Sequence, residues 1–341
     1  MSSAPAREGT TRSRRVADVP LLVEQAAGDS PALRARAVAR LISLVEDASP
    51  ALREVMALLA PRAGHASVIG LTGSPGVGKS TSTNALVAAY RRRGMKVGVL
   101  AIDPSSPFSG GALLGDRVRM QEHATDHGVF IRSMASRGHL GGLSWAAPQA
   151  LRVLSAAGCD VVLIETVGVG QAEVEVASLA DTTLVLLAPG MGDGIQAAKA
   201  GILEVADVFV VNKADRDGAD TVVRDLRYMQ SLGLQAPSQA EVEGKWVAPI
   251  VKTVAAKGEG ADEVVAEIER HGKWLAANGQ LELRRRKRAA DEVEVIALTV
   301  LRERIGDLHG NDALAGLAAR VVAGELDPYS AADELVEAVT G

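Results

Sequence analysis

The sequence predicts an α/β protein: a doubly wound, mostly parallel sheet with helical extensions before and after it. Three observations carry this prediction. Short apolar runs alternate with helical segments through the middle of the chain, a glycine-rich turn joins the first run to the first helix, and the strand pattern stops after residue 262. Short continuous apolar runs are typical of strands covered on both faces, and their alternation with helices indicates parallel pairing.

The apolar runs are expected to be strands, with helices between them. Because such sheets bind ligands beyond the carboxyl ends of their strands, we expect the functional residues in the loops that follow each strand. The predicted strands are residues 68–72, 97–102, 129–133, 161–165, 184–188, 208–212 and 249–251, and the helices between them include 79–93, 195–205 and 219–231.

The order of elements divides the chain into four segments. The first is rich in Arg and Ser, as a mitochondrial targeting segment is, but no apolar face is interleaved with its arginines. We therefore favour a disordered tail. The segments are a tail at residues 1–15, an N-terminal helical segment at 16–62, the sheet domain at 63–262 and a C-terminal helical extension at 263–341.

The helical segments carry recognisable signals. A helical pattern spans residues 21–60, with a start signal at 29–31 (Asp-Ser-Pro) and a break at 49–50 (Ser-Pro). In the C-terminal extension a basic run, residues 284–288, leads into an apolar stripe. This stripe has no sheet of its own, so it must pack on the core or on a second copy of the chain. Its members are Val293, Ile296, Ala297, Val300 and Leu301.

Composition excludes several classes of protein. The net charge of −5 and the pI near 5.8 argue against a nucleic-acid binder that depends on a broad positive field. No apolar run is long enough to cross a bilayer, so a cytoplasmic location is expected by default. The single cysteine, Cys159, excludes an internal disulfide and a Cys-rich metal site. Because it precedes an apolar run, it is expected to be a buried, inert thiol.

Residues 73–80, Gly-Ser-Pro-Gly-Val-Gly-Lys-Ser, match the phosphate-binding P-loop pattern completely. The glycines let the backbone N–H groups point at phosphate oxygens, and the following helix adds its positive N-terminal end. Lys79 supplies charge to the β and γ phosphates, and Ser80 offers a hydroxyl to Mg²⁺. The predicted phosphate-binding set is Gly73, Ser74, Pro75, Gly76, Val77, Gly78, Lys79, Ser80 and Thr81.

A second motif, Asn212-Lys213-Ala214-Asp215, predicts that the base is guanine. The Asp215 carboxylate can accept hydrogen bonds from the ring N–H and the exocyclic amine of guanine, and adenine offers no such pair of donors on that edge. Lys213 can lay its aliphatic stem along the base. On the other side of the base, backbone N–H groups are expected from Val254, Ala255 and Ala256.

A third motif, residues 165–168 (Glu-Thr-Val-Gly), ends a predicted strand and is expected to face the metal. The Glu165 carboxylate is placed to bind Mg²⁺ directly or through water, and the N–H of Gly168 to meet the γ phosphate. With Lys79, these residues form the predicted catalytic set. Asp103 and Asp116 are further candidate ligands, beside Ser80. Because Mg²⁺ takes only one or two carboxylates, not all of these acids need to bind at once.

The motifs together resemble the MeaB/ArgK group of P-loop GTPases, through residues 165–171, 103–106 and 110–120. The resemblance implies a G domain at 63–262 that binds GTP or GDP with Mg²⁺. It also implies a GTPase chaperone that gates adenosylcobalamin loading and protects methylmalonyl-CoA mutase, and a homodimer formed by the C-terminal helices. Residues 190–199, with Gln196 and Lys199, would form a mobile loop that responds to the nucleotide. Val254 departs from the serine usual in the family.

Two rival interpretations remain. A nickel-insertion GTPase shares the P-loop class but needs a Cys/His cluster, and the six histidines are dispersed. A pure binding module is disfavoured by the intact Lys79 and Ser80. No glutamine directly follows Gly168, and Gln171 is displaced, so slow intrinsic hydrolysis that a partner accelerates is expected.

Overall fold

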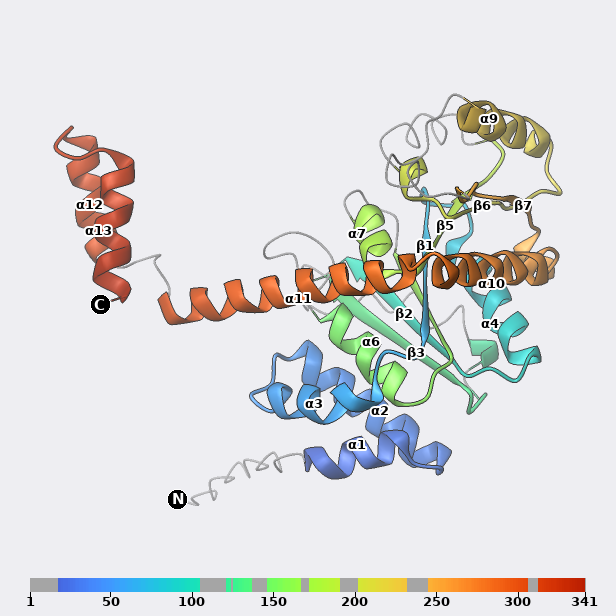
Figure 1. The fold of residues 1–341 in the computed structure, drawn as a ribbon, viewed down its shortest axis with the longest axis horizontal. Helices are drawn as coiled ribbons and strands as arrows, with labels where there is room; N and C mark the ends of the chain where they lie inside the picture. The colour runs from blue at the N-terminus through green and yellow to red at the C-terminus, as the bar shows by residue number, and fades with distance from the viewer. Residues whose placement is uncertain are drawn as a thin grey trace, which may run out of the picture. The chain divides into compact units, whose positions relative to one another are not determined.

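A parallel sheet organises the first of two compact units, Met1–Asn278, and the second unit is Gly279–Gly341. The computed structural model describes residues 18–104, 121–123, 125–136, 146–166, 172–190, 202–231, 245–305 and 312–340. Within these ranges the sheet has seven strands in the order β3-β2-β4-β1-β5-β6-β7, and all pairs are parallel (Figure 1). The predicted α/β class and parallel sheet are confirmed.

Each predicted strand is present, with small differences at the ends. The strands are β1 (Ser67–Thr72), β2 (Val97–Pro104), β3 (Val129–Ser136), β4 (Val161–Thr166), β5 (Thr182–Leu187), β6 (Val208–Val211) and β7 (Ile250–Lys252). The largest difference at the start of a strand is in β5, which begins two residues before the predicted position. Thr182 and Thr183 are buried although they are polar, so the apolar pattern did not include them.

Helices cover both faces of the sheet, as expected for a doubly wound fold. One face carries α4 (Lys79–Arg92) and α10 (Ala261–Ala277), and the other carries α6 (Ala147–Ala156), α7 (Ala172–Leu179) and α9 (Ala219–Ser231). Contact is close at Gly70 of β1, where an added Cβ would lie 2.4 Å from Cγ1 of Val176 in α7. A side chain at residue 70 would therefore push α7 away from the sheet.

Three N-terminal helices extend the hydrophobic core on the side of the sheet that α6 covers. They are α1 (Val19–Ala27), α2 (Pro31–Glu46) and α3 (Leu52–Leu59), followed by the 3₁₀ helix η1 (Ala60–Arg62), and α2 and α3 lie beside α6 (Figure 1). The helical prediction for 21–60 is confirmed, and a new helix starts at Pro31, at the predicted start signal. α1 ends before Gly28, which is extended, and the Arg34 guanidinium donates hydrogen bonds of 2.9 and 2.6 Å to the Gly28 carbonyl.

A buried polar cluster holds α10 against the sheet. The imidazole of His271 lies with Nδ1 2.9 Å from Oγ1 of Thr182 and Nε2 3.3 Å from the carboxylate of Asp207. The Asp207 carboxylate also accepts a hydrogen bond of 2.8 Å from the Thr183 amide, and the backbone carbonyl of Asp207 accepts one of 2.8 Å from the Trp246 indole. The sequence-based division assigned most of α10 to the C-terminal extension, but α10 packs within the first compact unit.

The second unit consists of helices. They are α11 (Gln280–Ile305), α12 (Asp312–Val322) and α13 (Pro328–Thr340). The basic run expected to precede a helix lies inside α11. An ion pair of 2.6 Å between Arg320 and Glu334 joins α12 to α13, and the Asp327 carboxylate accepts hydrogen bonds from the first amides of α13. In the part of the chain that the structure describes, no helix combines the length and apolarity needed to cross a membrane.

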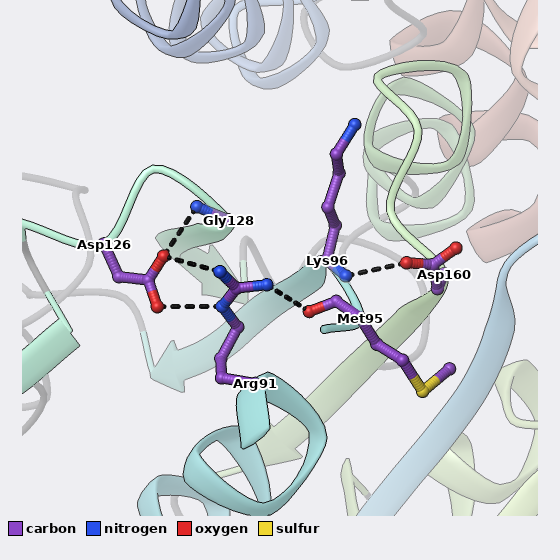
Figure 2. A network of polar contacts seen from close by, with 6 residues as sticks. All are labelled: Arg91, Met95, Lys96, Asp126, Gly128 and Asp160. Carbon is purple, nitrogen blue, oxygen red and sulfur yellow. Dashed lines mark hydrogen bonds and ion pairs between the residues drawn. The ribbon is translucent and has the colours of Figure 1, made fainter. Parts of the chain in front are cut away.

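Figure 2 shows a polar network at the end of α4 that is remote from the P-loop. Arg91 forms two hydrogen bonds to the Asp126 carboxylate, at 2.8 and 3.0 Å, and donates to the Met95 carbonyl. The Gly128 amide donates to the same carboxylate at 2.8 Å. These bonds lower the pKa of Asp126, and the hydrogen bond from Arg91 is the largest cause. The network fixes the C-terminal turn of α4.

In the same region, a hydrogen bond joins the start of β2 to the start of β4. The Lys96 amide donates to the Asp160 carboxylate at 2.7 Å (Figure 2). The adjacent Cys159 is buried, as predicted, and burial raises the pKa of its thiol to about 12. A thiol that stays protonated at neutral pH is a poor nucleophile, which agrees with the inert role expected for it.

We predict that Asp126→Asn destabilises the protein at pH 7 by about 1 kcal/mol, the scale of a partly exposed ion pair with good geometry. Since the folded-state pKa of Asp126 is lowered, its contribution is present above the unfolded pKa and is lost as pH falls through the folded value. Urea unfolding at pH 7 and pH 3 should therefore give a smaller difference at pH 3. Asp220→Asn, which alters an exposed pair with Lys252, is the control and should change little. An equal loss at both pH values would contradict the prediction.

Candidate nucleotide-binding site

The P-loop follows β1 at the position where the order of strands reverses. β1 lies between β4 and β5, and the connection after it leads through α4 to β2 on one side of the sheet. In doubly wound sheets such a reversal leaves a crevice beyond the carboxyl ends of the strands, where ligands bind. Lys79 is the first residue of α4, so the positive end of this helix faces the loop.

The P-loop backbone requires glycine at two positions for steric reasons. Gly73 and Gly78 have positive φ angles of 139° and 97°. A Cβ at Gly73 would lie 2.3 Å from the carbonyl oxygen of Leu186, and one at Gly78 would lie 2.4 Å from Nδ2 of Asn212. The loop is therefore pressed against β5 on one side and against the residue that follows β6 on the other.

Lys79 places its charge inside this loop. Only 7% of the residue is exposed, and its ammonium donates hydrogen bonds to the carbonyls of Gly73 and Ser74, the latter at 3.2 Å. The ammonium thus lies where the loop backbone curves around it. This position agrees with the predicted role of Lys79 toward the β and γ phosphates.

Glu165 lies at the end of β4 next to α4. It is 2% exposed, and one of its carboxylate oxygens accepts a hydrogen bond from the hydroxyl of Thr83, one turn into α4. Ser80 lies on the same helix. A serine hydroxyl and a single carboxylate are oxygen donors of the kind that Mg²⁺ takes, with water completing its shell. The described donor set therefore fits the predicted ion.

Asn212 joins the phosphate loop to the segment expected to contact the base. Its Nδ2 donates to the Val77 carbonyl at 2.8 Å, while its Oδ1 accepts from the Ala255 amide at 3.0 Å and from the Thr253 hydroxyl at 3.2 Å. Lys213, which follows it with a φ of 56°, donates to the Gly76 carbonyl at 2.6 Å. The second motif and the P-loop therefore form one hydrogen-bonded assembly.

The base-specificity residues lie beside this assembly. The Asp215 carboxylate is 46% exposed and 3.9 Å from the Lys257 ammonium. Of the three amides expected to face the base, that of Val254 donates to the Glu259 carbonyl and that of Ala255 to Asn212. The amide of Ala256 makes no hydrogen bond to another segment among the described residues. Of the three amides, we therefore expect that of Ala256 to contact the base.

The described part of the chain does not include every predicted residue. Asp116, Gly168, Gln171, Gln196 and Lys199 lie outside the described residues, and so does the side chain of Asp103 in β2. Within the described ranges, no group of three or more His, Cys, Asp and Glu is arranged to hold a metal ion. His123 lies in a 3₁₀ helix and His127 in a turn, so they do not share the face of one α-helix.

Sequence analysis missed Thr83, although its spacing from Lys79 is a usable signal. The two residues are four apart in α4 and therefore lie on one side of the helix, which faces the sheet. A buried hydroxyl at that position of a P-loop helix points toward the strands that end beside the loop. Which residue accepts the hydrogen bond of this hydroxyl depends on how α4 packs against the sheet. A local sequence pattern does not show that packing.

Comparison with known proteins identifies the family. The model of the methylmalonyl-CoA mutase-associated GTPase MeaB family matches residues 38–308. The chain belongs to this family. It is a GTPase with a P-loop fold that binds guanine nucleotides, and the resemblance inferred from the motifs is confirmed.

Individual relatives extend this result. A putative GTPase of Pyrococcus abyssi (strain GE5 / Orsay) is 45% identical over 306 residues, which cover 90% of this chain and 93% of the relative. GTPase ArgK of Escherichia coli (strain K12) is 38% identical over 258 residues, covering 74% and 77%. The crystal structure of an LAO/AO transport system kinase superposes with a TM-score of 0.66 at 27% identity, covering 95% of this chain and 96% of that one.

We predict that Gly78→Ala weakens GDP binding at least about tenfold, equivalent to about 1.4 kcal/mol. The new methyl group would displace the Asn212 amide, which is held by its own hydrogen bonds. Gly64→Ala is a matched control, because Gly64 has nearly the same φ, 96°, with nothing within 4 Å of the added Cβ. It carries the same backbone strain and should leave GDP affinity unchanged. Titration with fluorescent GDP measures both, and equal affinities would contradict the steric explanation.

Proposed function

We propose that this GTPase is a nucleotide-driven chaperone of an adenosylcobalamin-dependent mutase, of the methylmalonyl-CoA mutase type, which it loads and protects. The observation that carries the proposal is the match of residues 38–308 to a family described as mutase-associated. A relative in Caenorhabditis elegans supports it. That protein is named a mitochondrial methylmalonic aciduria type A homolog and is 38% identical over 219 residues, covering 64% of this chain and 54% of the relative.

The nucleotide chemistry rests on the assembly around the P-loop. The loop amides and Lys79 would hold the phosphates, and Ser80 and Glu165 would hold Mg²⁺, which supplies charge neutralisation at the transferring phosphoryl group. Lys79 is already surrounded by loop carbonyls, so its charge needs little rearrangement to reach a phosphate at the same position. Asp103 and Asp116 remain candidate ligands, and Gly168 a candidate γ-phosphate donor.

Base selection would depend on Asp215, with Lys213 along the base plane and the Ala256 amide at the guanine oxygen. The backbone of Lys213 has the left-handed conformation, with a positive φ angle. Its side chain reaches the P-loop, where it donates a hydrogen bond to the Gly76 carbonyl. Asp215 is half exposed, so its carboxylate is accessible to a ligand. A carboxylate that must pair with two guanine donors penalises a base that lacks them.

We predict that Asp215→Asn lowers GTP affinity at least about 100-fold, because two hydrogen bonds to a charged acceptor are lost and a donor is placed against a donor. The same variant should bind xanthosine triphosphate better than the wild type does. Competition titrations with both nucleotides measure the change. Asp217→Asn, an exposed acid of the same loop, is the control and should not alter the preference. Unchanged GTP affinity in Asp215→Asn would refute the assignment.

The chaperone role is tested by the mutase itself. We expect the chain to co-purify with a cobalamin-dependent mutase to an extent that differs between GDP and a non-hydrolysable GTP analogue. We also expect GTP turnover to be slow for the chain alone and to rise when the mutase is added. Turnover that is equally fast without the mutase, and no nucleotide-dependent co-purification, would argue against this function.

We also propose that the chain forms a homodimer through its C-terminal helices. In α11 the side chains of Val293, Ile296 and Leu301 are exposed by 66%, 42% and 51%. They belong to the apolar stripe identified in the sequence, and an exposed stripe of this kind is costly unless a partner covers it. A second copy of the same helix offers a matching surface.

Ile296→Asp should convert the dimer to a monomer, because it places a charge in the apolar stripe. Light scattering coupled to gel filtration measures the mass. Asp291→Lys alters the charge on the opposite side of α11, given about 100° of rotation per residue, and should leave the mass unchanged. A wild-type chain that is monomeric at micromolar concentration would contradict the proposal.

A further inference from the structure

Thr83 is a buried polar residue of α4 that lies next to the predicted metal site without being one of its predicted ligands. It is fully buried, and its hydroxyl lies within hydrogen-bond distance of two acceptors, the Glu165 carboxylate and the Lys79 carbonyl, the latter at 3.1 Å. A helical threonine usually satisfies its hydroxyl with the carbonyl four residues earlier, and needs no further acceptor. The hydroxyl has a single hydrogen to donate, and the charged carboxylate of Glu165 is a stronger acceptor than the carbonyl. The contact with Glu165 joins α4 to β4 across 82 residues of sequence.

The surroundings of Glu165 explain why this contact matters. In the sheet register Glu165 pairs with Leu71 of β1 on one side and with Ala101 of β2 on the other. These neighbours are apolar and offer no side-chain donor. A carboxylate that is 2% exposed is costly to keep unless a polar group satisfies it, and the Thr83 hydroxyl provides one such bond from the helix.

A glutamate also has one more side-chain torsion than an aspartate, so its carboxylate can adopt more positions. A hydrogen bond to one oxygen restricts those positions. Because Thr83 is one turn after the P-loop residues Lys79 and Ser80 on the same rigid helix, it ties the carboxylate to the element that carries the predicted serine ligand.

We propose that Thr83 is a positioning residue that orients Glu165 for Mg²⁺ and acts on the metal through that carboxylate. The inference rests on the proposed nucleotide and metal site. Without the Thr83 hydroxyl, the Glu165 carboxylate is less restricted, so Mg²⁺ binds the nucleotide complex more weakly. The phosphate loop is not altered, so the affinity for GDP in the absence of Mg²⁺ does not change.

The test uses the full chain with Thr83→Val, which keeps the shape and removes the hydroxyl, and Thr83→Ser, which keeps the hydroxyl. Ser82→Ala is the matched control. Ser82 is the preceding residue of α4, it is 6% exposed, and its hydroxyl has no hydrogen-bond partner among the described residues. Bound fluorescent GDP is displaced by excess unlabelled GDP at a series of free Mg²⁺ concentrations, and the rate of its release is measured. The Mg²⁺ concentration at which release is slowed by half of the maximal effect is recorded.

We expect Thr83→Val to raise this half-maximal Mg²⁺ concentration about tenfold, the loss typical of one hydrogen bond to a charged group. Thr83→Ser and Ser82→Ala should stay within about twofold of the wild type. GDP affinity in EDTA should be the same for all four proteins. Thr83→Ala is a second variant without the hydroxyl and should shift the Mg²⁺ concentration in the same direction, including where Thr83→Val fails to fold.

Three outcomes would overturn the inference: an unchanged Mg²⁺ dependence in the variants without the hydroxyl, an equal shift in Ser82→Ala, or an equal loss of GDP affinity in EDTA. The last outcome would mean that the hydroxyl supports α4 itself. If GDP release from the wild type did not depend on Mg²⁺, the proposed metal site would fail instead. The two failures are therefore distinguishable.

Discussion

The amide side chain of Asn212 is the interaction on which the nucleotide site depends. It is 3% exposed and donates to the P-loop at Val77 while accepting from Thr253 and Ala255. The phosphate loop follows the first strand and the base-side segment follows the last, so these hydrogen bonds join distant parts of the chain. One primary amide can serve both because it carries a donor and an acceptor on one rigid plane. This side chain, together with the hydrogen bond from Lys213 to Gly76, thereby helps to set the separation between the two halves of the site.

Much of the fold could be predicted because its signals are local. Continuous apolar runs gave the positions of the strands, and the P-loop was recognisable because its residues are contiguous. The start of β5 was displaced because Thr182 is polar, and its burial depends on His271, which is distant in sequence. The same limit applies to Thr83 and Glu165, since their contact depends on how α4 packs against β4. Periodicity shows that a helix has an apolar face and does not show what covers it.

The N-terminal and C-terminal helices are a further case in which the sequence predicts a helix but not what it packs against. The N-terminal helices and most of α10 lie outside the predicted bounds of the sheet domain, and both contribute to the cores beside the sheet. For α10 the decisive groups are His271 and Asp207, a buried pair that no strand pattern reveals. Burying such a pair costs free energy unless all its polar groups are hydrogen-bonded. The pair therefore favours the one position of α10 in which these hydrogen bonds form. Because α10 follows the base-side segment directly, its position also fixes where that segment ends.

The ammonium of Lys79 has a consequence for how tightly any nucleotide can be held. It donates to the carbonyls of Gly73 and Ser74 from within the loop that would surround the phosphates. A phosphate that binds this ammonium must compete with those carbonyls. The measured affinity for the nucleotide is therefore the free energy gained at the phosphate minus that lost at the carbonyls. These hydrogen bonds also keep the buried ammonium from being unsatisfied. Nucleotide affinity therefore depends on how well the carbonyls of Gly73 and Ser74 bind the ammonium, as well as on the phosphate itself.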